Sequence, residues 1–263
     1  MNLVLELLLF LATLLFSYLE AFVKLFVPVR RKSLSGELVL ITGAGHGVGR
    51  ATALEFAKRQ SRLVLWDINK HGVEETAAEC QKLGATVQSF VVDCSKREEI
   101  YSAADKVKKD IGDVTILVNN AGVITTAICN GRKLEIGFLL SHLYFLPSCS
   151  SSKFAAVGFH KALTEELSAL GKDGIKTTCL CPVFINTGFV KNPTTRLGKI
   201  LEIEEVVQAL MEGIVTNQKM VFVPPQLNIA LFTEMVFPER ALNLLKKMTI
   251  PKFDAIIGHR STQ

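Results

Sequence analysis

The sequence predicts an α/β protein whose main domain is a doubly wound parallel sheet, preceded by an apolar N-terminal helix. From Glu37 onward, short apolar runs alternate with helical patterns, which is typical of parallel strands covered by helices on both faces. A glycine-rich turn joins the first run to the helix that follows it. With 263 residues, 49% of them hydrophobic and 21% charged, the chain is long enough for one such domain and an appendage.

Residues 1–35 are expected to form an apolar anchor helix and a basic linker, and residues 36–263 the main domain. The apolar run Leu7–Leu19 has 13 residues, short of the ~20 that span a bilayer. Arg30, Arg31 and Lys32 follow it, and this order fits a helix lying in a lipid interface with its charges against anionic headgroups. A spanning helix, a cleaved secretory signal and a buried core helix are the alternatives. A secretory signal is disfavoured because no Lys or Arg precedes the apolar run.

Charge and cysteine usage exclude several classes of protein. The net charge is +5, but no dense stripe of Lys and Arg with interleaved aromatic residues occurs, so we expect no nucleic-acid partner. The six cysteines form no C-x-x-C pair, and a chain of this length needs no disulfide framework. We therefore expect reduced thiols in a cytosol-facing domain. Cys179 and Cys181 lack further ligands, and no metal site is predicted.

A dinucleotide site is predicted at the turn after the first strand. Leu38–Ile41 is a continuous apolar run, as in a strand buried on both faces, and Arg50–Arg59 has the apolar spacing of a helix. Glycines between them let the backbone approach a pyrophosphate, whose charge is stabilised by the helix N-terminus. This context on both sides indicates a Rossmann-type fold. The expected cofactor-binding residues of the turn are Gly43, Gly45, His46, Gly47, Val48 and Gly49.

Acidic residues end the second and third strands. The second strand, Arg62–Trp66, leads into Asp67, which lies 18 residues after Gly49. A carboxylate there can accept hydrogen bonds from the ribose hydroxyls of adenosine and repels a 2′-phosphate, which favours NAD over NADP. A turn or N-cap role is the alternative for Asp67. The third strand, 87–93, ends in Asp93, which either contacts the adenine amine or caps the next helix.

The later part of the chain continues the same alternation. Apolar runs predict a fourth strand at Val114–Val118, a buried strand at Thr177–Cys181 and a last strand at 219–224. Helical spacing predicts helices at Phe154–Leu170 and Glu202–Val215. Residues 226–248 either cap a substrate pocket, rest on lipid or form a plain packing helix.

Several motifs resemble the short-chain dehydrogenase/reductases. They are TGAGHGVG (42–49), NNAG (119–122), SSKFAAVGF (151–159) and CPVFINTGF (181–189). In LVLWDINK (63–70), VEETAAEC (73–80), VVDC (91–94) and FPERAL (237–242) the chain is similar to the lipid-droplet 17-beta-hydroxysteroid dehydrogenases of types 11 and 13. The resemblance implies that the cofactor site also includes Asn120, Ala121, Gly122, Lys153, Pro182, Ile185 and Thr187.

The same resemblance implies a function and a place in the cell. The expected reaction is NAD-dependent oxidation of a hydroxyl on a hydrophobic substrate such as a steroid, a retinoid or a lipid mediator. The expected location is the lipid droplet and the endoplasmic reticulum, on the cytosolic side, and the family often forms homodimers.

The catalytic residues depart from the family pattern. The family chemistry needs a Tyr four residues before a Lys on one helix, so that the Lys charge lowers the pKa of the phenol. Lys153 is in place, but Cys149 occupies the Tyr position, and its side chain is too short to reach a substrate oxygen. Tyr144 is nine residues before Lys153, on the opposite helix face. The family Ser would fall at Ile136, and Ser141 is out of register.

A shortened central unit accounts for these losses. Only 26 residues, Val123–Ser148, separate NNAG from Cys149, where the family places a long helix and a central strand. A crossover needs at least ~12 residues, so a shorter unit can fit, and Leu134–Phe145 could form either a strand or a helix. Without a central strand its neighbours lose their partners. We therefore expect a shortened variant of a longer enzyme that lacks part of the catalytic region, and the sequence leaves open whether it is active, impaired or unstable.

Overall fold

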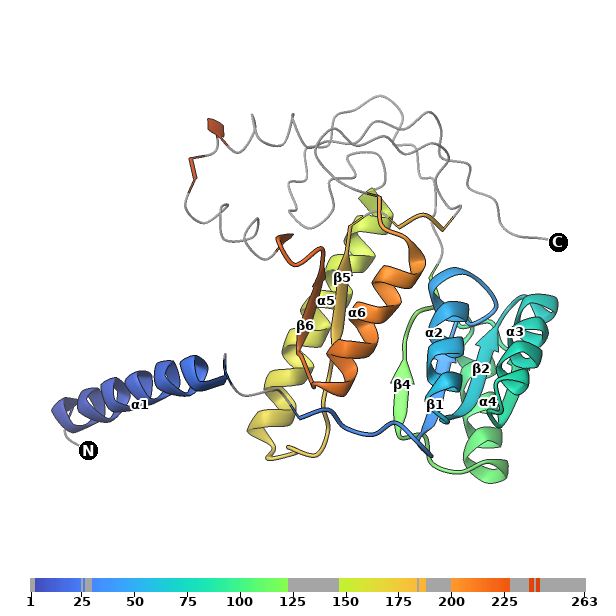
Figure 1. The fold of residues 1–263 in the computed structure, drawn as a ribbon, viewed down its shortest axis with the longest axis horizontal. Coiled ribbons are helices and arrows are strands. Elements are labelled where there is room, and N and C mark those ends of the chain that lie inside the picture. The colour runs from blue at the N-terminus through green and yellow to red at the C-terminus, as the bar shows by residue number, and fades with distance from the viewer. Residues whose placement is uncertain are drawn as a thin grey trace. The chain divides into compact units, whose positions relative to one another are not determined.

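The computed structural model describes residues 3–24, 26, 30–122, 147–183, 185–187, 200–227, 237–238 and 240–241. The chain divides into two units, Met1–Ser33 and Leu34–Gln263. Figure 1 shows both, and each is described here by itself.

The first unit contains one long helix, α1 (Leu3–Lys24). Its large apolar side chains are exposed all along its length, among them Leu8, Phe10 and Phe16. The hydroxyls of Thr13 and Ser17 donate hydrogen bonds to carbonyls one turn earlier on the same helix, each at 2.8 Å. Among the residues that the structure describes, no helix has the length and apolar content needed to cross a membrane.

The second unit contains the predicted parallel sheet. Four strands pair in the order β3-β2-β1-β4, all parallel; they are β1 (Leu38–Thr42), β2 (Arg62–Asp67), β3 (Val87–Val91) and β4 (Ile116–Val118). The helices that connect them are α2 (Gly47–Lys58), α3 (Lys70–Lys82) and α4 (Arg97–Asp110). The α/β class and the parallel sheet are thus confirmed.

Helices cover both faces of this sheet. Val39 and Ile41 of β1 pack into one apolar cluster with Phe56 of α2 and with residues of α3 and α6 (Ile203–Val215). Alternate residues of β1 and β2 turn to the opposite face, where Leu40 packs in a second cluster with Val107 of α4. This arrangement confirms the doubly wound architecture.

The remaining strands form a separate sheet. β5 (Cys179–Pro182) pairs in parallel with β6 (Met220–Val223), and α5 (Pro147–Ala169) precedes this pair in the chain. Figure 1 shows β5 and β6 close to α5 and α6. Within the described residues no strand joins β4 to β5, and the described strands form two sheets; the segment Leu134–Phe145 lies outside those residues.

Strands β4 and β5, each at an edge of its described sheet, contain exposed or partly exposed residues. Leu117 in β4 is 57% exposed, although it would be buried between two neighbouring strands and a covering helix. Every residue of β5 is partly exposed. The predicted strand at Thr177–Cys181 is thus present as β5, but the prediction that it is fully buried was wrong. Within the described residues β5 has a partner strand, β6, on one edge alone.

Candidate functional site

In the glycine-rich turn between β1 and α2, several glycines are required by the backbone conformation or by close packing. Gly43 and Gly47 have φ values of +66° and +56°, in the left-handed region that favours glycine. A Cβ on Gly49 would overlap the carbonyl oxygen of Gly43 and lie 2.6 Å from Nδ2 of Asn120. The loop is thus drawn tightly over the C-terminal end of β1, where a phosphate-binding turn is expected.

Asn120, in the NNAG segment after β4, fixes this loop. Its Nδ2 donates to the carbonyl oxygens of Thr42 and Gly43, both at 3.1 Å. The backbone N–H groups of Asn120 and Ala121 donate to Oγ1 of Thr42, also at 3.1 Å. The Thr42 hydroxyl itself donates to the carbonyl oxygen of Val118 at 3.4 Å. The ends of two neighbouring strands and the first glycine of the loop are therefore joined by one hydrogen-bond network.

Replacing Asn120 by Ala is expected to loosen the loop. The change leaves two partly buried carbonyls without their donor, and each unsatisfied group costs ~1–3 kcal/mol. We expect the free energy of unfolding to fall by ~1–3 kcal/mol, with a parallel loss of dinucleotide affinity. Urea unfolding measures the first and nucleotide titration the second. Asn119→Ala, at the exposed neighbouring position, is the matched control. Equal effects of the two variants would show that the hydrogen bonds of the Asn120 side chain do not hold the loop.

The N-terminus of α2 is available to an anion. Its N-cap, His46, is exposed and makes no side-chain capping hydrogen bond. Val48 turns its side chain toward the apolar core, so it can contribute only its backbone N–H. Cγ2 of Thr187 lies 3.8 Å from the position a Cβ would take on Gly47. Thr187 therefore lies beside the positive end of α2, where backbone N–H groups favour a phosphate.

Asp67, at the end of β2, is held over the glycine loop. Its Oδ2 accepts the N–H of Gly45 and its Oδ1 accepts the N–H of Asn69, both at 2.8 Å. The residue is partly exposed. An ionised carboxylate has about four acceptor positions, so two remain for ribose hydroxyls. The geometry agrees both with the turn role and with the ribose role predicted for Asp67.

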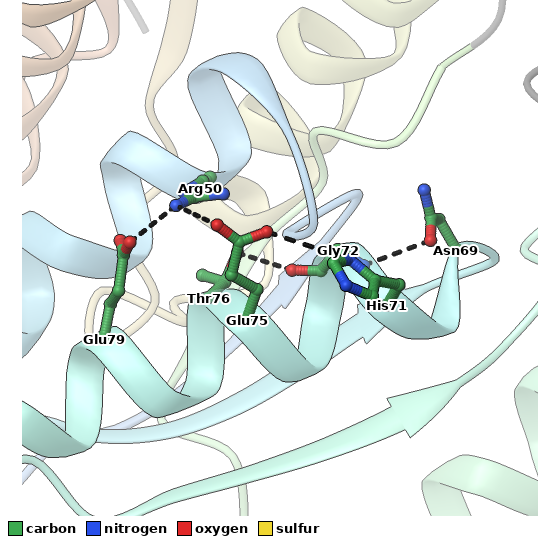
Figure 2. Close-up of polar contacts among 7 residues, drawn as sticks. All are labelled: Arg50, Asn69, His71, Gly72, Glu75, Thr76 and Glu79. Carbon is green, nitrogen blue, oxygen red and sulfur yellow. Dashed lines mark hydrogen bonds and ion pairs between the residues drawn. The ribbon is translucent and has the colours of Figure 1, made fainter. Parts of the chain in front are cut away.

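Helix α3 packs against the glycine loop and forms ion pairs with α2 (Figure 2). Asn69 caps α3 by accepting the N–H of Gly72 at 3.1 Å, and a Cβ on Gly72 would lie 2.8 Å from the carbonyl oxygen of Gly45. Nη2 of Arg50 donates to Glu75 at 3.1 Å and to Glu79 at 2.7 Å. The hydrogen bond to Glu75 raises the pKa of Arg50. The guanidinium in the first turn of α2 is thus held by two carboxylates of α3.

Asp93 forms a turn ahead of α4. Its Oδ1 accepts the N–H of Ser95 at 2.9 Å and the Ser95 hydroxyl at 2.6 Å. The N-cap of α4 is Lys96 and has no side-chain capping hydrogen bond, so Asp93 holds the preceding turn and does not cap the helix itself. These hydrogen bonds do not test a contact with adenine.

Lys153 and the loop after β5 come from the second piece of the sheet. Nζ of Lys153 lies 3.6 Å from the position a Cβ would take on Gly122. Cys149 belongs to the first turn of the same helix, α5. Pro182 ends β5, and Ile185 forms an isolated bridge with Leu201. The remaining candidates of the catalytic region, Ile136, Ser141 and Tyr144, lie outside the described residues.

Two residues that shape the glycine loop were not predicted from the sequence. Thr42 was placed in the motif 42–49 but given no role, and Gly72 was not singled out. The signal for Thr42 is a hydroxyl residue between the apolar strand and the first glycine. For Gly72 it is a glycine placed three residues after Asn69, at the start of a helix packed on the loop.

Comparison with known proteins gives consistent relatives. Residues 37–135 match the short chain dehydrogenase family. The chain is 53% identical to 17-beta-hydroxysteroid dehydrogenase 13 of Rattus norvegicus over 298 aligned positions, which cover 99% of each chain. It is also 53% identical to estradiol 17-beta-dehydrogenase 11 of Homo sapiens over 296 positions, with the same coverage of both chains.

Solved structures share the fold. A short-chain dehydrogenase/reductase from Burkholderia phymatum in complex with NAD superposes with a TM-score of 0.62 at 20% identity, covering 81% of this chain and 96% of that one. A short-chain dehydrogenase from Sphingobium yanoikuyae in complex with NADPH also gives 0.62 at 20% identity, covering 86% and 98%. The fold therefore accommodates both dinucleotides.

The chain belongs to the short-chain dehydrogenase/reductase family of oxidoreductases. Within that family it is closely related to the 17-beta-hydroxysteroid dehydrogenases 13 and 11 over nearly its whole length. The alignment with the rat protein has 298 positions and this chain has 263 residues, so at least 35 aligned positions of that relative have no counterpart here. This difference agrees with the predicted shortening.

Proposed function

We propose that the chain binds NAD in the cradle formed by the glycine loop, Asn120 and Asp67. The observation that carries the proposal is the closure of this cradle, in which Gly49 leaves no room for a side chain and Asp67 is fixed by two backbone N–H groups. The carboxylate would accept hydrogen bonds from an unphosphorylated ribose and repel a 2′-phosphate. The ion pairs of Arg50 with Glu75 and Glu79 support the same preference for NAD. Because two carboxylates already bind this guanidinium, it is not free to pair with the 2′-phosphate of NADP.

The reaction of the lineage is proposed to be oxidation of a hydroxyl on a hydrophobic substrate. Its relatives are 17-beta-hydroxysteroid and estradiol dehydrogenases, which supports a steroid as the substrate. A retinol or a lipid mediator is proposed only from the resemblance of the motifs. Bound NAD supplies a hydride acceptor. The N–H groups at the start of α2, with Thr187, would hold its phosphates, and the Lys153 ammonium beside Gly122 would hold its second ribose.

Proton removal is the step for which this chain lacks a group. The family position for the phenol holds Cys149, one helical turn before Lys153. A thiol has neither the reach nor the geometry of the tyrosine, and a positioned acid or base contributes ~10²–10⁴-fold to the rate. Among the described strands, none connects β4 to β5, the two strands on either side of this part of the chain. These two observations favour a second candidate function, a cofactor-binding protein with little or no turnover.

The first unit, with its basic linker, is proposed to hold the domain on a lipid surface. Helix α1 exposes apolar side chains along its whole length, and the hydroxyls of Thr13 and Ser17 are paired within the helix, so these two groups keep their hydrogen bonds in contact with lipid. Arg30, Arg31 and Lys32 would then face anionic headgroups. Lipid droplets and the cytosolic side of the endoplasmic reticulum are the proposed location, and a homodimer is the proposed assembly.

Turnover measured beside cofactor binding separates the two candidates. With NAD and either estradiol or retinol, we expect the chain to turn over at least ~10²-fold more slowly than rat 17-beta-hydroxysteroid dehydrogenase 13 under the same conditions, while NAD binding is retained. Spectrophotometry of NADH formation and calorimetric titration provide the two values. Robust turnover that Lys153→Ala abolishes would instead establish the dehydrogenase, and absence of NAD binding would contradict both candidates.

A further inference from the structure

Two thiols lie side by side on β5. Cys179 and Cys181 are two residues apart on one strand, so their side chains point to the same side, and their Sγ atoms are 4.0 Å apart. Both residues are partly exposed. We propose that this pair is a binding site for trivalent arsenicals, soft electrophiles that bond to two sulfur atoms at once.

The two thiols have different pKa values, and the reaction with an arsenical needs one of them to ionise easily. The hydrogen bond between the two thiols lowers the pKa of Cys179 to about 7, and the same interaction raises the pKa of Cys181. The Lys161 ammonium on α5 acts in the opposite direction on Cys181. Near neutral pH, Cys179 is thus a thiolate in a large fraction of molecules, and the thiolate is the form that attacks.

A bridging atom suits this pair better than a direct disulfide. Residues two apart on a strand have Cα atoms ~6.6 Å apart. That separation lies at the upper limit of ~6.8 Å that disulfides span, and the parallel direction of the two Cβ atoms adds strain. An arsenic atom between the sulfurs requires only that two half-exposed side chains turn toward each other.

The proposed step balances without an oxidant. The Cys179 thiolate attacks arsenic in an organoarsenic(III) oxide, and the second sulfur follows. Two As–S bonds form, the As–O bond breaks, and the oxygen leaves as water with the two thiol protons. Arsenic stays trivalent and both sulfurs stay at the thiolate level.

Cys80 and Cys94 lack these properties. Cys80 is fully buried, and burial raises its pKa to about 11. Burial also raises the pKa of Cys94, and the nearby carboxylates of Asp93 and Asp67 act in the same direction. Cys80 is therefore a suitable internal control for the pair on β5.

The test uses the full chain in detergent micelles, treated with one equivalent of phenylarsine oxide and then with excess glutathione. Intact-mass measurement is expected to show one retained arsenical, which peptide mapping assigns to β5 and which dithiothreitol removes. Because the second bond is intramolecular, Cys179→Ser or Cys181→Ser should reduce retention ~10²-fold. Cys80→Ser should leave it unchanged. Circular dichroism checks that the variants share the wild-type fold.

Alkylation gives a second, independent readout. The rate at which iodoacetamide modifies Cys179 should rise with pH through a midpoint near 7, since the thiolate fraction rises there. Loss of the arsenical to glutathione, unchanged retention in both serine variants, or an adduct mapped away from β5 would each overturn the proposal.

Discussion

Gly49→Ala is expected to abolish dinucleotide binding and to destabilise the domain. The added Cβ would overlap the carbonyl oxygen of Gly43 and come within 2.6 Å of Nδ2 of Asn120, and neither neighbour is the free end of a flexible side chain. Overpacking of this kind costs ~1–3 kcal/mol or more. We expect a loss at the upper end of that range, and a thermal midpoint lower by ~2–4 °C for each kcal/mol. Urea or thermal unfolding, together with NAD titration, measures both effects.

Gly174→Ala is the matched control for this prediction. No atom lies within 4 Å of the position that its Cβ would take, and its backbone is outside the left-handed region. A surface change of this kind alters stability by less than ~0.5 kcal/mol. If Gly49→Ala behaved like Gly174→Ala, with wild-type affinity for NAD, the packed-loop account of the site would be wrong.

Asp67→Ala is expected to weaken NAD binding and to remove the preference for NAD over NADP. The change deletes the acceptor of the N–H groups of Gly45 and Asn69 and the acceptor proposed for the ribose hydroxyls. A hydrogen bond to a charged group contributes ~1.5–3 kcal/mol, so NAD affinity should fall ~10-fold or more. Removal of the charge that repels the 2′-phosphate should also strengthen NADP binding. The ratio of NADP affinity to NAD affinity should therefore rise by ~10²-fold when the two effects are combined. Titration with both dinucleotides at one fixed salt concentration measures the ratio.

Asp93→Ala is the control that separates the change in cofactor preference from a general loss of negative charge at the strand ends. Its carboxylate holds the turn at Ser95, and adenine is common to both dinucleotides, so the ratio of the two affinities should not move. An unchanged ratio in Asp67→Ala, or an equal shift in Asp93→Ala, would remove Asp67 from the role of cofactor selector.

The strands and the helices were predictable to different degrees. Strands β1 and β2 are buried on both faces, so each gives a continuous apolar run, and β1 is followed by the glycines that identify α2. Helices α3 and α4 were not assigned from spacing. Each has one narrow buried stripe, such as Val73 and Ala77 in α3, on a largely charged helix, and this gives a weak periodic signal.

The candidate site was predictable where it is local in sequence. The glycines and Asp67 follow from spacing around one strand–turn–helix unit. The approach of Thr187 to Gly47 and of Lys153 to Gly122 joins segments far apart in the chain, and only resemblance to a family indicated those positions. The exposure of β5 could not be predicted from its own residues, because it depends on which neighbours the strand has.

Calorimetric titration of NAD into the full-length chain in micelles tests the central claim most directly. The account predicts a saturable heat for one NAD per chain, a much weaker response to NADP, and no heat with Gly49→Ala. A chain that unfolds cooperatively, and so is shown to be folded, yet gives no heat with NAD would contradict it.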